Sequence, residues 1–572
     1  MPLIRSKRFL FFLLFVFPFL SACDYSSHGK KAKGGKFYGG TFTYVAETVS
    51  PSIFPLKSIR PAVQRVVTML FEPLVKIEAK NRVAPFLAKR FSISPDGKQI
   101  VLTIRKNVFF HADPCFNGES NEMTVEDVKF SLEFACSANP LNQMHNVLGD
   151  KIVGSEIFYK YSKKTFPKKG VQGIKIINDS TISISLNKPY VNFLSLLTHP
   201  NLGIHSKKAF EFYGQNIDKH PVGTGPFYLK DWSKAKVVFC RNSVYWRKDL
   251  FGNQLPFLSE VCVLNNKLVK NEMNLFTSGK TDLLMELPVD KLENAFGTLS
   301  DAQKGKNVLH RTLFQKGVKI NFFSFNCKTA PFNDWRVRKA FQLAINRQQI
   351  VDEILNGDGD LSNNGFVPKS EFYNSKKVKN FSFNLEKART LLAEAGFPNG
   401  KGFPKLALYV SNTQPTIVHK YCRHCVEQLN KQLGLQLTTK FTSIQKRNRL
   451  IKKGQVLFWK SGWTADYPDP EAYLGLFYSR YRNENNDMWN INSFQNSKFN
   501  ALFEQMQIEK NKAKRLALQN ACDQIIIDDV ACVPLYTKDL FVLVNIRVRD
   551  ISVSRSGIID LSKTYLKAIQ PN

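Results

Sequence analysis

The sequence predicts an α/β protein with more than one lobe, and three observations support this. Segments with the alternation typical of strands and segments with helical spacing follow one another along the chain, which favours an α/β architecture. The chain has 572 residues, and a single hydrophobic core stops growing well before that length. Its composition, 43% hydrophobic and 22% charged, is that of a globular protein rather than a disordered or membrane-embedded one.

The N-terminus has the pattern of a secretory signal peptide. Basic residues precede an apolar run at 9–20, which is shorter than the roughly 20 residues of a membrane-spanning helix. The run ends in Leu20-Ser21-Ala22-Cys23, which resembles a lipobox. We therefore expect a signal peptide at 1–22 and acyl chains on Cys23 that anchor the mature protein to the outer face of the cytoplasmic membrane. The alternative is a chance cysteine behind an ordinary signal peptide.

The segment after the anchor is a predicted tether, and strands follow it. Residues 24–36 are rich in Ser, Gly and Lys without an apolar period, so we expect a flexible linker that ends by residue 38. Order is expected from Gly39, with a strand at 41–45. Another strand is expected at 101–105, after the turn at Pro95-Asp96-Gly97.

Further along, capping and turn signals place helices and a hairpin. Thr124 with Asp127 three positions later has the pattern of a capping box. Alternating runs on either side of Asn178-Asp179-Ser180 predict a hairpin over 174–186. Helical spacing covers 335–355, and Asn384 and Gly396 bracket a further predicted helix as its N-cap and its end.

The charge balance is strongly basic, at +34 from 81 Lys and Arg against 47 Asp and Glu. The basic residues are spread along the chain, no nucleic-acid-binding motif is present, and the export signal removes the protein from nucleic acid. We therefore predict no nucleic-acid partner and leave open a lysine-biased proteome or attraction to anionic lipids. Without Cys23, nine cysteines remain, so at least one thiol is expected to be free.

Several motif fragments suggest other chemistry but are incomplete. The segment 278–281 imitates the end of a phosphate-binding loop, yet Asn274 stands where the first glycine should be. The cluster of His419, Cys422, His424 and Cys425 does not have the spacing of a zinc site. There is no serine nucleophile elbow and no metalloprotease helix motif. We predict no metal, no cofactor and no enzymatic activity.

Blocks in the same order along most of the chain resemble the family 5 extracellular solute-binding proteins, the oligopeptide and dipeptide receptors of ABC importers. The matching blocks are 85–88, 94–97, 102–105, 108–111, 124–128, 223–227 with 241–246, and 331–334 with 337–340. The strongest is Gly-Trp-Thr-Ala-Asp-Tyr-Pro-Asp-Pro at 462–470, which is similar to the family segment that lines the peptide cleft. The loop at 113–116 is longer than the family's short turn.

The resemblance implies a bilobed fold of the type II, cluster C periplasmic-binding-protein class, with an extra domain and a hinge between the lobes. By analogy, lobe I is discontinuous and the chain divides as follows: lobe I at 39–72, 186–285 and 541–572; domain II at 73–185; lobe III at 286–540. A hinge motion is expected to close the lobes around the ligand.

The resemblance also implies a ligand site built on 460–466. Asp466 would supply the negative charge that a desolvated α-ammonium requires. Gly462 and Thr464 lie where a ligand backbone could pair as an added strand. Trp463 is expected either to touch ligand side chains or to pack in the core, and Lys460 either to approach the peptide backbone or to be a solvated lysine.

These features together predict a receptor that captures short peptides, closes on them and delivers them to an ABC permease. We expect a monomer whose membrane contact is the lipid anchor. Alternatives keep the fold and change the solute to a dipeptide, cell-wall peptide, nickel chelate, haem or sugar. A surface adhesin or signalling receptor and a secreted hydrolase are the alternatives from other classes.

Overall fold

The computed structural model describes residues 30–46, 52–57, 61–78, 81–266, 272–285, 310–362, 364–379, 381–413, 416–481 and 489–567. The predicted signal peptide and Cys23 lie outside these residues, so both stay predictions. Within the described ranges, no helix is both long enough and apolar enough to cross a bilayer.

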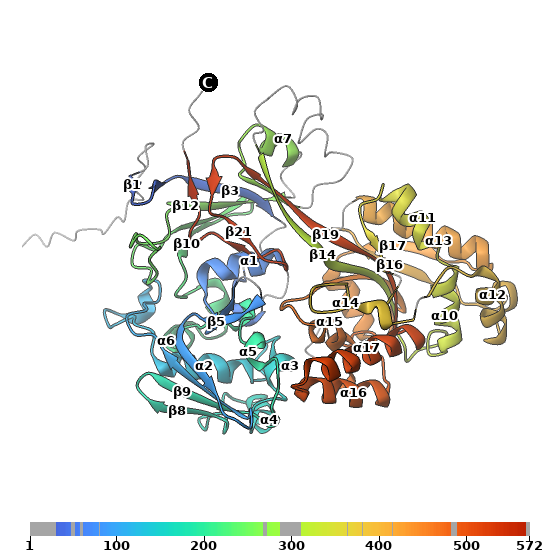
Figure 1. Cartoon of the computed structure of the whole chain (residues 1–572), viewed down its shortest axis with the longest axis horizontal. Coiled ribbons are helices and arrows are strands. Elements are labelled where there is room, and N and C mark those ends of the chain that lie inside the picture. The colour runs from blue at the N-terminus through green and yellow to red at the C-terminus, as the bar shows by residue number, and fades with distance from the viewer. Residues whose placement is uncertain are drawn as a thin grey trace, which may run out of the picture.

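Two long strands connect the two halves of the molecule (Figure 1). They are β14 (His310–Phe325) and β19 (Cys532–Asn545), which pair antiparallel along nearly their whole length. We call residues 30–285 together with 546–567 the N-terminal half, and residues 320–535 the C-terminal lobe. This arrangement confirms the predicted α/β architecture with more than one lobe.

A sheet of 11 strands extends across both halves through β14 and β19. On the side of the N-terminal half its strands are β13 (Leu283–Met285), β3 (Thr41–Ala46), β12 (Glu260–Asn265), β11 (Lys236–Arg241) and β10 (Phe227–Trp232). In the C-terminal lobe they are β18 (Phe458–Thr464), β16 (Ala407–Ser411) and β17 (Thr438–Thr442), with β15 (Asp360–Leu361) paired to β19. Strand β3 confirms the strand predicted at 41–45.

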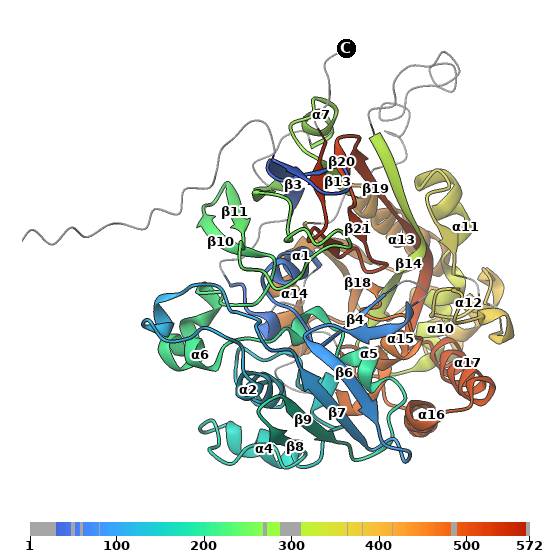
Figure 2. The ribbon, with the colours of Figure 1, turned by 60° about the vertical axis from the view of Figure 1, so that its left-hand side comes forward.

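A separate sheet of four strands lies at the other end of the N-terminal half from β3 (Figure 2). Its order is β6 (Ala88–Ile93), β7 (Gln99–Ile104), β9 (Thr181–Ser185) and β8 (Ile174–Asn178). Strands β8 and β9 form the predicted hairpin. The short pair β4 (Val75–Ile77) and β5 (Val83–Pro85) precedes this sheet along the chain.

Helices cover the sheets in both halves. Those of the N-terminal half are α1 (Pro61–Leu70), α2 (Val125–Ala135), α3 (His145–Leu148), α4 (Ser155–Ser162), α5 (Phe193–Leu196), α6 (Lys207–Tyr213) and α7 (Glu272–Thr277). Those of the C-terminal lobe are α10 (Trp335–Ala344), α11 (Arg347–Gln349), α12 (Leu385–Glu394), α13 (Thr416–Leu433), α14 (Ile444–Lys452), α15 (Glu471–Leu474), α16 (Ser497–Ile508) and α17 (Lys512–Asp528). Helix α2 begins with the predicted capping box, and α12 has the predicted cap at Asn384.

The single helix expected over 335–355 is wrong. Helix α10 ends at Ala344, and Ile345 has an extended backbone with φ −90° and ψ 113°. The Asn346 side chain then accepts a hydrogen bond from the Gln349 backbone N–H and starts a new short helix. The cause is local. An asparagine at an N-cap accepts a hydrogen bond from a backbone N–H that has no partner in the first turn of a helix, so Asn346 favours the start of a new helix over the continuation of α10.

The prediction of a flexible tether up to residue 38 is also wrong for residues 31–37, which form a hairpin. Lys31–Ala32 and Lys36–Phe37 pair as the strands β1 and β2. The Lys33 backbone N–H donates to Asn253 Oδ1, and Asn253 Nδ2 donates back to the Lys33 carbonyl, each at 3.0 Å. Lys36 Nζ lies 2.9 Å from an Asp550 carboxylate oxygen. These contacts come from residues more than 200 positions away, so no local pattern could indicate them.

The block at 223–246 that resembles the family surrounds a buried acid. The Glu72 side chain is 2% exposed and accepts hydrogen bonds from Tyr245 Oη at 2.6 Å, Trp246 Nε1 at 2.8 Å and Thr224 Oγ1 at 3.0 Å. Burial raises the pKa of Glu72 to about 7, although these donors oppose the rise. The motif residues therefore hold the N-terminal half together.

We predict that Glu72 makes the stability of the protein depend on pH. Its folded-state pKa of about 7 lies above the ordinary value of 4.5, so the folded state binds this proton more tightly than the unfolded chain. The contribution is full below about pH 4.5 and is lost as the pH rises through 7, on the order of 3 kcal/mol. Thermal unfolding between pH 5 and 8 should therefore show a falling melting temperature, and Glu72→Gln should flatten that slope. An equal slope in both proteins would contradict this.

Candidate functional site

Strand β18 carries the predicted ligand-binding residues and has one open edge. It pairs with β14 along its length, with Asn321 opposite Gly462. On its other edge β16 reaches only Phe458 and Trp459. Among the described strands, none pairs with this edge at 460–464. Gly462 is exposed there.

The backbone direction at this edge follows from one contact. Arg447 Nη1 donates to the Lys460 carbonyl at 2.8 Å, so that carbonyl faces away from β14. Because backbone direction alternates along an antiparallel strand, the N–H and C=O of Gly462 and Thr464 face the same way. The open edge therefore offers donors and acceptors to an extended chain lying beside β18.

Lys460 lies under this edge and is not a solvated lysine. It is only 4% exposed, and its Nζ would lie 3.5 Å from a Cβ built on Gly462. The two residues are on the same face of β18 because side chains alternate along a strand. The structure thus places the Lys460 ammonium beneath Gly462.

Trp463 points to the opposite face and packs against the protein. Its Nε1 donates to the Ala472 carbonyl at 2.8 Å, and its ring meets Trp489 edge to face with centroids 5.5 Å apart. The indole is half-buried against the large apolar cluster. Of the two roles predicted for Trp463, the observed contacts are those of core packing, which fixes the end of β18 against α15.

Asp466 follows β18 and lies where the two halves of the molecule meet. Its side chain is 15% exposed, and its Oδ2 is 3.2 Å from Nε2 of His199, which belongs to the N-terminal half. Nearby, burial raises the pKa of Tyr473 to about 12; the Asp466 charge adds to the rise, and Arg555 opposes it.

The other carboxylates of this segment have structural partners. Asp469 accepts two hydrogen bonds from the Arg515 guanidinium, at 2.6 Å and 3.0 Å. Glu471 is buried and accepts from Asn192 Nδ2 at 2.8 Å and from Gln507 Nε2 at 2.9 Å. Asp469 is neutralised by a bidentate arginine pair of the strong kind. Within the described part of the chain, Asp466 has no lysine or arginine within 4 Å.

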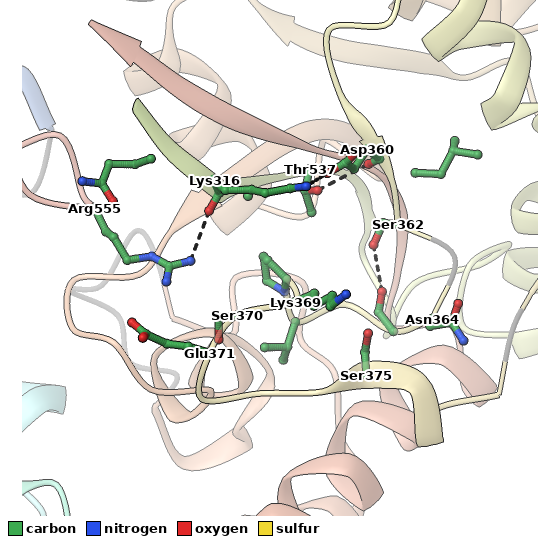
Figure 3. Close-up of a pocket in the computed structure, with 16 residues that line it drawn as sticks. Lys316, Asp360, Ser362, Asn364, Lys369, Ser370, Glu371, Ser375, Thr537 and Arg555 are labelled. Atoms are coloured by element: carbon green, nitrogen blue, oxygen red, sulfur yellow. Dashed lines mark hydrogen bonds and ion pairs between the residues drawn. The ribbon is translucent and has the colours of Figure 1, made fainter. Parts of the chain in front are cut away.

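A cavity of about 740 Å³ lies beside the connecting strands (Figure 3). Its lining comes from both sides of the boundary: β14 and β19 at Lys316 and Thr537, the segment 360–375 of the C-terminal lobe, and Arg555 of the N-terminal half. Arg555 Nη2 donates to the Lys316 carbonyl at 3.2 Å. No carboxylate of the described residues forms an ion pair with this guanidinium.

One wall of the cavity is held by a buried acid on α17. Asp523 accepts from the Phe366 backbone N–H and from the Tyr373 hydroxyl, each at 2.7 Å, and from the Val367 N–H at 3.3 Å. Burial raises the pKa of Asp523 to about 6, and these donors oppose the rise. The carboxylate fixes the backbone of 366–373 and therefore the shape of the cavity wall.

Direct contacts hold the two halves against each other around the site. The Asn81 side chain donates to Glu371 at 2.7 Å, and the Val191 N–H donates to the Gln507 carbonyl at 2.9 Å. Lys151 is fully buried with its Nζ 3.0 Å from Tyr481 Oη. A single apolar cluster includes residues of both halves. The described arrangement is therefore one in which the lobes are in contact.

The two incomplete motifs at 278–281 and 419–425 form parts of the fold. Residues 278–281 follow α7, and the buried Asp282 accepts from the Thr43 N–H at 2.8 Å. The cluster at 419–425 lies along α13, where Cys422 and Cys425 are buried. In the described ranges no three His, Cys, Asp or Glu side chains group so as to hold a metal ion, and none of the nine described cysteines forms a disulfide.

No sequence motif indicated two residues of the site. His199 and Arg555 lie far from 462–470 along the chain, in segments without a recognisable motif. Only the packing of the two halves brings His199 to Asp466 and Arg555 to the cavity.

The chain is similar to known proteins over most of its length. The family model for bacterial extracellular solute-binding proteins, family 5 Middle, matches residues 82–485. The chain is 25% identical over 535 residues to heme-binding protein A of Haemophilus influenzae (90% of this chain, 91% of that protein) and 24% identical over 541 residues to the oligopeptide-binding protein OppA of Bacillus subtilis (90% and 91%).

A solved structure shows the same fold. The periplasmic binding protein DppA of Helicobacter pylori, in complex with peptide STSA, superposes with a TM-score of 0.78 at 22% identity, covering 93% of this chain and 99% of that one. The predicted bilobed fold of the periplasmic-binding-protein class is thereby confirmed. The chain belongs to the bacterial extracellular solute-binding proteins of family 5.

Proposed function

We propose that this protein is the substrate-binding lipoprotein of an ABC importer, and that it captures short peptides between its halves. The observation that carries the proposal is the position of Asp466, at the boundary between the halves and beside the open edge of β18. A peptide offers a cation at its N-terminus and backbone groups along its length. The site offers a carboxylate at Asp466 and, next to it, an edge of β18 at 460–464 that none of the described strands pairs with.

The physical argument is that a receptor for many peptides must use what all peptides share. Backbone pairing at Gly462 and Thr464 is independent of ligand sequence. Asp466 supplies a negative charge, and no lysine or arginine among the described residues lies within 4 Å of it. Lys460 lies beneath the same edge and favours the carbonyl oxygens of a bound backbone.

The cavity suggests where the rest of the ligand lies. At about 740 Å³ it is within the range of small-molecule sites, roughly 300–1,000 Å³. Arg555 and Lys369 on its lining suit a terminal carboxylate. A peptide running from Asp466 toward Arg555 would contact both halves, and such contacts favour the closed state.

The relatives support a peptide and also define the rival. The Helicobacter pylori protein holds the peptide STSA, and the Bacillus subtilis relative is an oligopeptide-binding protein. The Haemophilus influenzae relative is named for haem. The rival function is therefore the same fold with another solute. A carboxylate for an ammonium and an arginine for a carboxylate favour the peptide.

The remaining parts of the proposal concern the membrane and the partners. The mature protein is anchored through acylated Cys23, acts as a monomer and presents its closed form to the permease. Lobe I, domain II and lobe III follow the boundaries 39–72 with 186–285 and 541–572, 73–185 and 286–540. No catalytic role is assigned to any residue, and an adhesin or signalling role would leave the cleft without a peptide.

We predict that Asp466→Asn weakens peptide binding while the protein stays folded. The isosteric amide removes the charge, and loss of one partner of a desolvated ion pair costs about 2–5 kcal/mol, roughly 30-fold or more in affinity. Calorimetry with a short peptide that has a free N-terminus measures this. Wild-type affinity in the variant would contradict the assignment.

A matched control comes from the same motif. Asp469→Asn breaks the bidentate pair with Arg515 and should lower the melting temperature, which Asp466→Asn should leave almost unchanged. Asp528→Asn on the exposed side of α17 should change neither property. If the Asp469 variant kept its stability and lost affinity instead, the roles of the two aspartates would be reversed.

We predict that Cys23→Ser releases the protein from membranes. Without a thiol no acyl chain can be attached, and the membrane affinity supplied by buried methylenes is lost. Fractionation of cells that express each form, with a radiolabelled fatty acid as tracer, measures both location and acylation. A labelled, membrane-bound serine variant would place the anchor elsewhere.

A further inference from the structure

His199 faces Asp466 from the other half of the molecule. It follows α5 and is the N-cap of a short 3-10 helix at Pro200–Leu202. The imidazole is 5% exposed, and its Nε2 lies 3.2 Å from Asp466 Oδ2. A buried side chain of the N-terminal half thus meets the carboxylate that the proposed function assigns to the ligand ammonium.

The hydrogen bonds of the ring assign its tautomer. The Asn201 backbone N–H donates to His199 Nδ1 at 3.1 Å, so Nδ1 is the acceptor and carries no proton. The ring proton is then on Nε2, which donates to Asp466. The imidazole is neutral, so the His199–Asp466 pair keeps the full negative charge of the carboxylate.

Hydrogen bonds of the neighbouring Asn201 side chain fix the loop that carries His199. The Asn201 side chain is fully buried, its Oδ1 accepts from Gln64 Nε2 at 2.9 Å, and its Nδ2 donates to the Pro55 carbonyl. These bonds tie the 3-10 helix to α1 and to the segment before it. His199 therefore approaches Asp466 as part of a rigid element of the N-terminal half.

We propose that His199 is a positioning residue that sets Asp466 for the ligand ammonium when the two halves come together. This inference rests on the proposed function. The Nε2–H holds Oδ2, which leaves Oδ1 for the ammonium. A lysine or arginine in this place would orient the carboxylate equally well but would cancel its charge, as Arg515 does for Asp469.

The pair also links recognition to closure. His199 and Asp466 belong to different halves, so their hydrogen bond exists only when the halves are in contact. Asp466 is held in its orientation in that state alone. A ligand cation that binds Oδ1 therefore binds the closed form better than the open one, and that difference favours closure.

The test uses the mature full-length protein with His199→Ala and His199→Gln, and one short peptide in free and N-acetylated forms. Glutamine places an amide N–H donor near the position of Nε2. Calorimetry should show that His199→Ala weakens binding of the free peptide about tenfold or more, while His199→Gln restores most of the affinity. Binding of the acetylated peptide should be weak in the wild type and unchanged in both variants. His220→Ala, at an exposed histidine of the same half, should bind like the wild type.

Each other result overturns the proposal. Wild-type affinity of His199→Ala for the free peptide would remove His199 from recognition, and the proposed function would stand as long as Asp466→Asn still fails to bind. Equal losses for both peptides in both variants, with a lower melting temperature, would make His199 merely structural. A wild type that binds neither peptide would sink the proposed function, and this inference with it.

Discussion

The pairing of β14 with β19 is the constraint on which the rest of the structure depends. The two strands connect the halves, and their register shifts between Gln315 and Lys319 and again between Asn321 and Phe322. Extra residues of this kind bend a strand and interrupt its ladder. The cavity opens beside the first irregularity, at 315–317, and β18 pairs with the next stretch of β14, at 319–325. The site is therefore placed by the strands that also connect the lobes.

The partners of its acidic side chains determine where the site keeps a negative charge. In a chain with a net charge of +34, a carboxylate has many cations available to neutralise it. Arg515 neutralises Asp469 and also lies 3.4 Å from the buried Glu471, which accepts hydrogen bonds from two amides as well. Asp466 instead meets an imidazole whose hydrogen bonds keep it neutral. A negative charge survives at the boundary between the halves because its partner is a neutral donor.

Much of the fold could be predicted from short sequence patterns, because the caps and turns concerned are formed by residues that are close together in the sequence. The capping box at Thr124 needs only two side chains three residues apart, and the hairpin over 174–186 needs only a turn between alternating runs. The motif at 462–470 predicted an extended segment, and its first residues form the end of β18. The residues of this motif have different roles, however. Trp463 and Asp469 hold the segment in place through contacts within the protein. The sequence alone could not distinguish such structural residues from residues that contact a ligand.

What the sequence could not predict depends on distant partners. The hairpin at 31–37 exists because Asn253 and Asp550 meet it, and the break at Asn346 shows a cap overriding a helical period. His199 and Arg555 reach the site only through the packing of the two halves. Such residues have no motif of their own, since their role comes from where the fold puts them.

The most direct test of the central claim is a crystal structure of the protein with a bound short peptide. The account predicts the peptide N-terminus within hydrogen-bonding distance of Asp466 Oδ1, with His199 still on Oδ2 and the peptide backbone paired to the edge at Gly462. A ligand bound elsewhere, or one whose ammonium lies far from Asp466, would contradict it.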